Sequence, residues 1–248
     1  MPEQTTLSYA LPATEMPNDV RDQLHPWIAD IAGMNPSAAH QSLEKRWEHL
    51  TSSSLCNLRD RLLEFHPASI VVHDKFADLH CLRDPNQASV SSDAHAMFVP
   101  PPLEKDFIQR NLEVFGMEEL DSVAEFFLGF AGLGDQIPLV AGRFPYIEWS
   151  RFADWWGPDT QGYKKWVDAL VLYHALNGDQ VLLHASGQVG WCVMDSNTVI
   201  EIANSFDEFI EHYTEFKESD HVFEAWTSRE LLDFKNQDPN YNDEYPIL

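Results

Sequence analysis

The sequence predicts an α+β fold in which an antiparallel β-meander is flanked by helices and preceded by a helical N-terminal extension. Apolar residues recur at helical spacing between positions 20 and 65. Four β-type runs then follow one another between positions 169 and 202, and a capped amphipathic helix comes directly after them. Hydrophobic residues make up 44% of the 248 residues, so the chain can bury a sizeable core.

Residues 1–102 are predicted to form a helical region and a linker. A first helix is expected to carry Val20, Leu24, Trp27, Ile28 and Ile31; a second, starting at Asn35-Pro36, Leu43, Trp47 and Leu50; and a third Leu55, Leu58, Leu62 and Phe65. From Pro67 the pattern becomes irregular, although a short β-branched run occupies 70–72. The proline triplet 100–102 cannot lie inside a helix, and it is the clearest predicted domain boundary.

Residues 103–217 are predicted to form an α+β domain. Two helices are expected over 107–115 and 117–131, and the Gly-rich turn 132–135 ends the second helix. A phosphate-binding loop would instead follow a strand and open a helix, so this interpretation is not favoured.

The meander is expected to use strands at 169–176, 181–185, 189–193 and 199–202, with a turn at Asn177-Gly178. Ser205 and Glu208 then fit a capping box, and the helix that they start has an apolar face. Residues 218–248 are predicted to form an acidic helix (222–234) and a tail, which could pack on the same core.

The charge balance bears on the class of partner. Sixteen Lys and Arg stand against 40 Asp and Glu, which gives a formal net charge of −24. Phosphate backbones and anionic membranes would be repelled, so we expect neither nucleic acid nor membrane as a partner. A basic protein would be attracted; alternatively, the acidity serves only solubility or a salty habitat.

The sequence gives no support for a metal, a cofactor or a catalytic group. Cys56, Cys81 and Cys192 are widely spaced and lack a paired motif, so neither a disulfide framework nor a zinc site is predicted. His66, His73 and His80 recur every seven residues, but Pro67 argues against one helix that would align them. No nucleophile motif occurs, and we predict a non-enzymatic protein.

Two further expectations concern the second half and the location of the chain. His174 and His184 could face each other across the first hairpin of the meander. No secretory leader pattern or long apolar stretch is found, so a cytoplasmic location is expected.

The candidate partner-binding residues come mainly from one aromatic stretch that contains Trp149, Phe152, Trp155, Trp156, Tyr163 and Trp166. Most of these rings are expected in the core, because Trp149, Phe152 and Trp156 lie at helical spacing. Trp155 and Trp156 are neighbours that cannot both face one core, so one of them should be exposed. The candidates are Asp135, Asp154, Trp155, Trp156, Asp159 and Tyr163.

Residues 104–216 resemble the SUKH superfamily, the fold of the Smi/Knr cell-wall-synthesis regulators and of many bacterial immunity proteins. The resemblance rests on the helix 125–130 before the turn Gly132-Leu133-Gly134-Asp135, on the runs 178–183 and 187–191, and on 202–210, which is similar to the family's A-x-S-F-x-E-F-L helix start. The first hundred residues have no counterpart in the family, and Leu133 stands in a turn where the family often has Asn and Gly together.

The resemblance implies a protein-binding domain, and for bacterial members an immunity protein that neutralises a cognate toxin, often a nuclease. A nuclease is basic where it holds its substrate, so an acidic inhibitor would be steered towards that surface. Two alternatives are a regulatory scaffold of the Smi/Knr type and an enzyme with a site between the N-terminal helices and the sheet.

Overall fold

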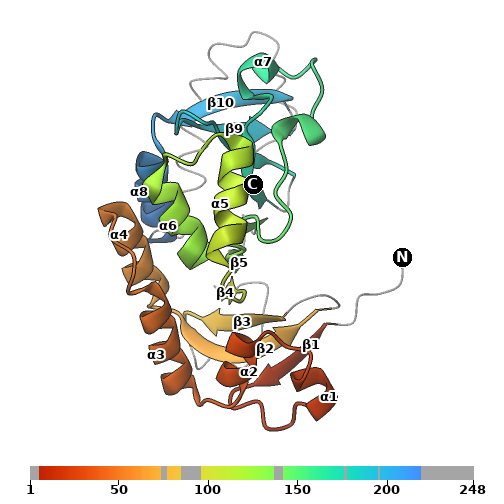
Figure 1. The fold of residues 1–248 in the computed structure, drawn as a ribbon, viewed down its shortest axis with the longest axis vertical. Helices are drawn as coiled ribbons and strands as arrows, with labels where there is room; N and C mark the ends of the chain where they lie inside the picture. The colour runs from red at the N-terminus through yellow and green to blue at the C-terminus, as the bar shows by residue number, and fades with distance from the viewer. Residues whose placement is uncertain are drawn as a thin grey trace.

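The computed structural model describes residues 6–73, 77–84, 96–136, 142–175, 178–194 and 196–218. The predicted α+β class is confirmed (Figure 1). The helices are α1 (Asn18–Arg21), α2 (Pro26–Ala32), α3 (Pro36–Trp47), α4 (Ser53–Leu62), α5 (Lys105–Phe115), α6 (Asp121–Phe130), α7 (Tyr163–Trp166) and α8 (Phe206–Glu218), with a 3₁₀ helix, η1 (Phe152–Asp154). The strands are β1 (Leu7–Ala10), β2 (His66–Val72), β3 (Ala77–Leu82), β4 (Ala96–Val99), β5 (Gly134–Gln136), β6 (Gly142–Arg143), β7 (Leu170–Ala175), β8 (Gln180–Leu183), β9 (Val189–Val193) and β10 (Thr198–Ala203).

The strands of the described ranges form one antiparallel sheet in which each strand pairs with its neighbours in the chain. Two four-stranded parts, β1–β4 and β7–β10, are joined by the short strands β5 and β6. An antiparallel meander can be closed by short connections, as between β2 and β3 and between successive strands from β7 to β10.

Capping side chains and prolines mark the first residues of helices α2 and α3. The side chain of Asn35 accepts a hydrogen bond from the backbone N–H of Ala38 (2.9 Å), and Pro36 occupies the first turn of α3. The single helix predicted over positions 20–31 is wrong. The structure divides it into α1 and α2, because Pro26 cannot donate within a helix and instead starts a new one, capped by His25.

The connecting region predicted from Pro67 to Pro102 is also wrong in its secondary structure, because 66–99 contain β2, β3 and β4. The first strand, β1, pairs with β2, so the extension contributes strands as well as helices. Every residue of β3 is buried, including Asp78 and His80. A strand buried on both faces lacks the alternation by which strands are found in a sequence.

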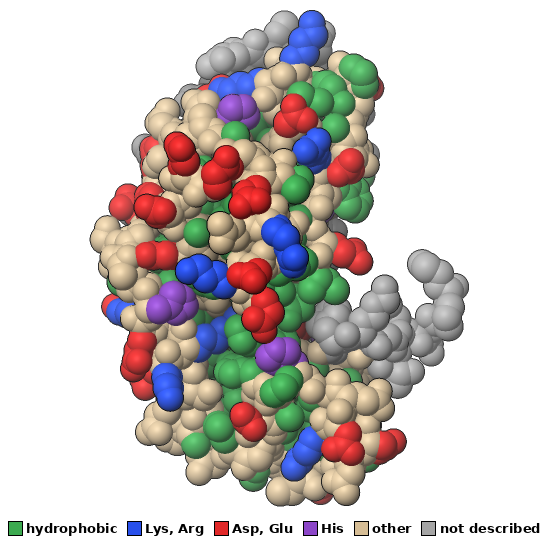
Figure 2. Space-filling model, in the orientation of Figure 1, with side chains coloured by type: hydrophobic (Ala, Val, Ile, Leu, Met, Phe, Trp, Pro, Cys, Tyr) green, Lys and Arg blue, Asp and Glu red, His purple; other side chains and the backbone are tan. Residues whose placement is uncertain are grey.

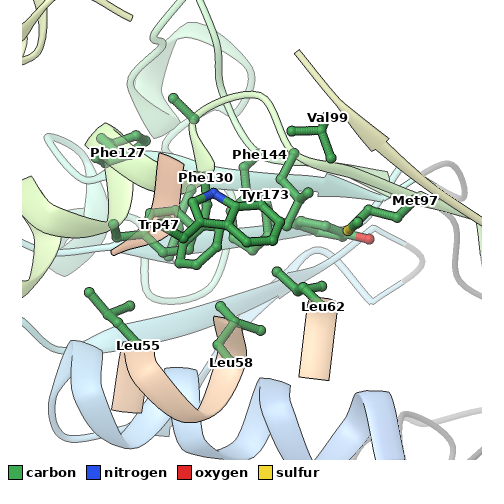
Figure 3. Close-up of a cluster of buried hydrophobic side chains, with 14 of the residues drawn as sticks. Trp47, Leu55, Leu58, Leu62, Met97, Val99, Phe127, Phe130, Phe144 and Tyr173 are labelled. Atoms are coloured by element: carbon green, nitrogen blue, oxygen red, sulfur yellow. The ribbon is translucent and has the colours of Figure 1, made fainter. Parts of the chain in front are cut away.

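Helices from both parts of the chain cover the same face of the sheet. α2 and α3 pack on β2, α8 packs on β10, and α4 lies along α8 (Figure 1). The core between them draws side chains from α3, α4, β4, α6 and β7 (Figure 3). Trp47 of α3 donates from Nε1 to the carbonyl oxygen of Gly129 in α6 (3.0 Å). The predicted parts 1–102 and 103–217 therefore share one hydrophobic core, and their division into domains stays a prediction.

In the second half of the chain, the observed elements agree closely with the predicted ones. The helices predicted over 107–115 and 117–131 form α5 and α6, and the four predicted strands form β7 to β10. Ser205 Oγ accepts from the N–H of Glu208 (3.1 Å), while the carboxylate of Glu208 accepts from the N–H of Asn204 (2.7 Å), one residue before the expected donor. The helix predicted at 222–234 lies outside the described residues.

Candidate partner-binding surface

The face of β7–β10 that points away from the helices is covered by residues 149–166, called the aromatic segment below. Beneath it lies a small second core made of Phe152, Trp166, Ala169, Val171, Leu182 and Cys192. The segment includes η1 and α7, and it replaces the continuous helix that the spacing of its rings suggested. Its backbone is tied to the sheet through Phe152, whose N–H donates to the carbonyl oxygen of Ala169 (2.9 Å).

Two of the six rings of the aromatic segment are buried, three are half-buried and one is exposed. Phe152 and Trp166 are fully buried, and Trp166 rests on β9 at Gly190, where a Cβ atom would come within 2.8 Å of its ring. Trp149 turns the other way and packs on the main core, with its ring 4.1 Å from that of Phe127. These three rings therefore fasten the segment to the protein, and those of Phe152 and Trp166 are covered completely.

A β-bulge in β7 decides which sheet residues meet the segment. The register shifts between Val171 and Tyr173, so Leu172 and Tyr173 both face the main core and His174 returns to the face of Val171. His174 then lies opposite Gln180 of β8, not opposite His184 as the hairpin suggested. Gln180 Nε2 and His174 Nδ1 are 3.4 Å apart, and this pair forms the polar floor under the segment.

As expected, one of the two neighbouring tryptophans is exposed, and the other packs against the protein. Trp156 is half-buried and donates from Nε1 to Gln180 Oε1 (3.0 Å). Trp155 is 59% exposed, yet its position is fixed, because Nε1 donates to Ser150 Oγ (2.9 Å) and its ring meets the ring of His174 edge to face at 5.1 Å. Trp155 is thus a large apolar side chain that faces solvent in a held orientation.

The predicted carboxylates near Trp155 lie on the surface. Asp154 is exposed, and its carboxylate accepts from the N–H of Arg151 (2.7 Å), which fixes the first turn of η1. Asp159 is exposed too, with Oδ1 held over Gly157. Tyr163 is half-buried against Phe152. Four of the predicted residues besides Trp155 therefore belong to one segment, namely Asp154, Trp156, Asp159 and Tyr163.

Asp135 does not belong to this group. It lies on β5, where its backbone pairs with Met97 and Gly142, and β6 separates that strand from β7. Its side chain is outside the described part of the protein.

Burial keeps the floor of the site uncharged near neutral pH. It lowers the pKa of His174, so that imidazole is neutral beside the indole of Trp155. Burial, followed by the charge of Asp179, raises the pKa of the Cys192 thiol to about 12, so the thiol beneath the segment stays protonated. Any charge that a partner meets here comes from the exposed carboxylates of Asp154 and Asp159 and from the cations of Arg151, Lys164 and Lys165.

The histidines of the seven-residue series have different neighbours, and the ring of His66 lies 5.7 Å from that of His40. His80 Nδ1 lies 3.2 Å from Ser69 Oγ, and His73 Nε2 lies 3.3 Å from a carboxylate oxygen of Asp78, which also binds Arg143. Among the described residues, no three His, Cys, Asp or Glu side chains gather in a way that could hold a metal ion. Buried apolar side chains such as Ile28, Leu43 and Trp47 lie between the N-terminal helices and the sheet, and an enzymatic site in this region stays an untested alternative.

Sequence reasoning did not identify Ser150, His174 and Gln180 as the groups that position the two tryptophans. Regular alternation of side chains along β7 would place His174 on the side of the main core. The bulge reverses this alternation, and no local sequence pattern indicates it. No helix in the described ranges is both long and apolar enough to cross a membrane. No family model matches the chain, and no curated protein or solved structure matches it either.

Proposed function

We propose that this chain is a non-catalytic protein-binding module that engages a basic partner through the surface around Trp155. The observation that carries the proposal is the state of Trp155, which is 59% exposed but anchored by Ser150 and His174. Tryptophan is the residue most enriched at the energetic centres of protein interfaces. An indole that is already fixed loses little conformational freedom when a partner covers it.

Exposed carboxylates near Trp155 support a basic partner, and they stand beside the cations Arg151, Lys164 and Lys165 of the same segment. Asp154 and Asp159 are exposed on the same segment, and the side chain of Asp168 is 80% exposed although Arg151 lies 3.7 Å from it. Figure 2 shows Asp and Glu side chains over much of the visible face, among fewer Lys and Arg. Elsewhere on the surface, α5, α6 and their connection carry further exposed carboxylates, namely Glu113, Glu118, Glu119 and Asp121.

The finer form of the proposal is an immunity protein of the SUKH type that neutralises a toxin, with a nuclease as the expected class. The net charge of −24 supports it, because a surface that holds nucleic acid is basic and would be masked by an acidic inhibitor. A regulatory scaffold of the Smi/Knr type would use the same surface for several partners. An immunity protein would bind a single partner tightly, whereas a scaffold would bind several partners.

The test is a titration of the full chain with the protein encoded next to it, at low and at physiological salt. We expect one-to-one binding that weakens as salt rises, because the steering charges are screened over about 8–10 Å. Trp155→Ala should raise Kd about 10- to 30-fold, or about 1.4–2 kcal/mol. Met194→Ala, which trims another exposed apolar side chain (53%) on the turn after β9, is the matched control and should leave Kd unchanged.

Two results would contradict the proposal. If Trp155→Ala binds the partner as tightly as the unaltered chain, Trp155 is not the anchor. If binding is insensitive to salt, the acidic surface does not select the partner. Binding of several unrelated proteins with similar Kd would favour the scaffold form.

A further inference from the structure

The two edges of the ten-stranded sheet differ in how they are protected. At β10, the backbone of Gln161 pairs with the strand, since the N–H of Val199 donates to Gln161 O (3.0 Å) and the N–H of Gln161 donates to Asn197 O (3.0 Å). The same edge carries a charged pair, Lys165 and Glu201, at 2.6 Å. Charges and covering segments are the usual means by which proteins prevent a strand edge from pairing with another chain.

Among the described residues, neither form of protection is found at the β1 edge. The N–H of Leu11 donates to the carbonyl oxygen of Ala68 (2.9 Å), and by alternation Tyr9 and Leu7 also direct their backbone groups towards β2. Ser8 and Ala10 therefore direct their N–H and C=O groups outwards. Both residues are exposed, and no hydrogen bond reaches these backbone groups from the part of the chain that the structure describes.

The side chains along this edge are neutral and partly apolar. From Thr6 to Pro12 the sequence has no charged residue, within a chain whose net charge is −24. Leu7, Tyr9 and Leu11 project from the same side of the strand, and Leu7 is 44% exposed while the other two are half-buried. An acidic second copy would be repelled by most of this protein's surface, whereas this edge presents no charge to it.

We propose that β1 is a dimerisation edge, at which β1 of a second copy pairs antiparallel around a two-fold axis at Tyr9. In this register Ser8 lies opposite Ala10 of the second copy, so the outward backbone groups of each pair satisfy each other. Leu7 then faces Leu11 of the second copy, and Tyr9 faces its own counterpart, which covers the exposed apolar strip. The proposal does not depend on the proposed function, because the aromatic segment lies at the other end of the sheet, on β7–β10.

The experiment is sedimentation velocity of the full chain over a concentration series at about 0.05 M and 0.5 M salt. We expect a monomer–dimer equilibrium whose association constant rises with salt, because screening weakens the repulsion between two acidic copies. Ala10→Pro removes an outward N–H without removing a bond to β2, and it should lower the association constant at least tenfold with an unchanged melting temperature.

A second pair of variants tests the edge without proline. Leu7→Lys places a charge on the edge, and Met194→Lys places the same charge on the turn after β9 at a side chain of similar exposure. Both variants reduce the net negative charge equally, so only the position differs. Leu7→Lys should lose dimer, and Met194→Lys should keep it. A chain that is monomeric under every condition, or a Leu7→Lys variant that dimerises like Met194→Lys, would overturn the proposal.

Discussion

At the scale of single residues, Trp47 joins two helices through a buried hydrogen bond. Gly129 lies in the last turn of α6, where carbonyl oxygens have no partner within the helix, and the indole of Trp47 supplies one. Trp47→Phe would keep a ring in the core but leave that buried carbonyl unpaired. We expect it to lower the free energy of unfolding by about 2–4 kcal/mol, from the lost hydrogen bond and the smaller ring.

Urea denaturation monitored by circular dichroism would measure this loss. Trp155→Phe is the matched control, since it makes the same change at an exposed indole and should cost less than about 1 kcal/mol. Equal losses for both variants would mean that the bond to Gly129 is not what makes Trp47 important.

Residue-scale features of the site were only partly predictable. The exposure of one tryptophan in the Trp155–Trp156 pair follows from the geometry of neighbouring positions, and the structure exposes Trp155. The role of His174 could not be anticipated, because a single extra residue in β7 changes the side of the sheet to which it points. Bulges depend on the packing of the whole sheet, which local sequence does not encode.

At the scale of elements, two carboxylates join α4 to α6 and α8. Asp207 of α8 accepts from the hydroxyls of Ser52 (2.8 Å), Ser54 (2.6 Å) and Ser122 (2.9 Å). Glu125 of α6 accepts from the N–H groups of Thr51 and Ser52 and from the Thr51 hydroxyl. Burial opposes the charge on both groups, yet the hydrogen bonds outweigh it and lower the pKa of each carboxyl.

Asp207→Asn should therefore destabilise the fold in a pH-dependent way. A carboxyl whose pKa is lower in the folded state adds stability above its unfolded pKa, which is 3.8 for Asp, and loses it as pH falls through the folded value. We expect a loss of about 1–2 kcal/mol at pH 7 that shrinks below about pH 4. Asp121→Asn, at an exposed position of α6, is the control for thermal melts across this range. A difference that persists at pH 2 would show that charge is not the cause.

Elements were predictable where local signals are strong. Asn35-Pro36, Gly116 and the Ser205–Glu208 pair mark helix ends that the structure confirms, and the turn signals of the second half correctly separate β7 to β10. The strands β2 to β4 were missed, since Asp78 and His80 interrupt the apolar run of β3 although both are buried. Their burial is allowed by partners from other elements, such as Arg143, which no local pattern reveals.

At the scale of the whole molecule, the sheet joins parts of the chain that are distant in sequence. β1 pairs with β2 across four helices, and β5 and β6, three and two residues long, connect the two four-stranded parts. The continuous core shown in Figure 3 supports this weak junction, because Trp47, Leu58 and Phe144 come from different parts yet pack together. Pairings of this kind depend on tertiary packing, so the sequence predicted the fold class but not the single ten-stranded sheet.

The stability of the whole molecule should fall as pH drops through the range in which histidine titrates. Burial lowers the pKa of His80 and of His174 below the ordinary value of 6.5, so the unfolded chain binds protons more strongly than the folded one. The free energy of unfolding is then complete above about pH 6.5 and decreases below it, by at most about 1.4 kcal/mol per pH unit for each imidazole. This pH range lies above the one in which Asp207 and Glu125 lose their charge, so the two effects on stability can be separated.

Urea titrations at pH 7.5, 6.5, 5.5 and 5.0 would measure this effect. The free energy of unfolding should depend less on pH in the double variant His80→Gln/His174→Gln than in the unaltered protein. If the double variant keeps the original slope, groups other than these two histidines control the response.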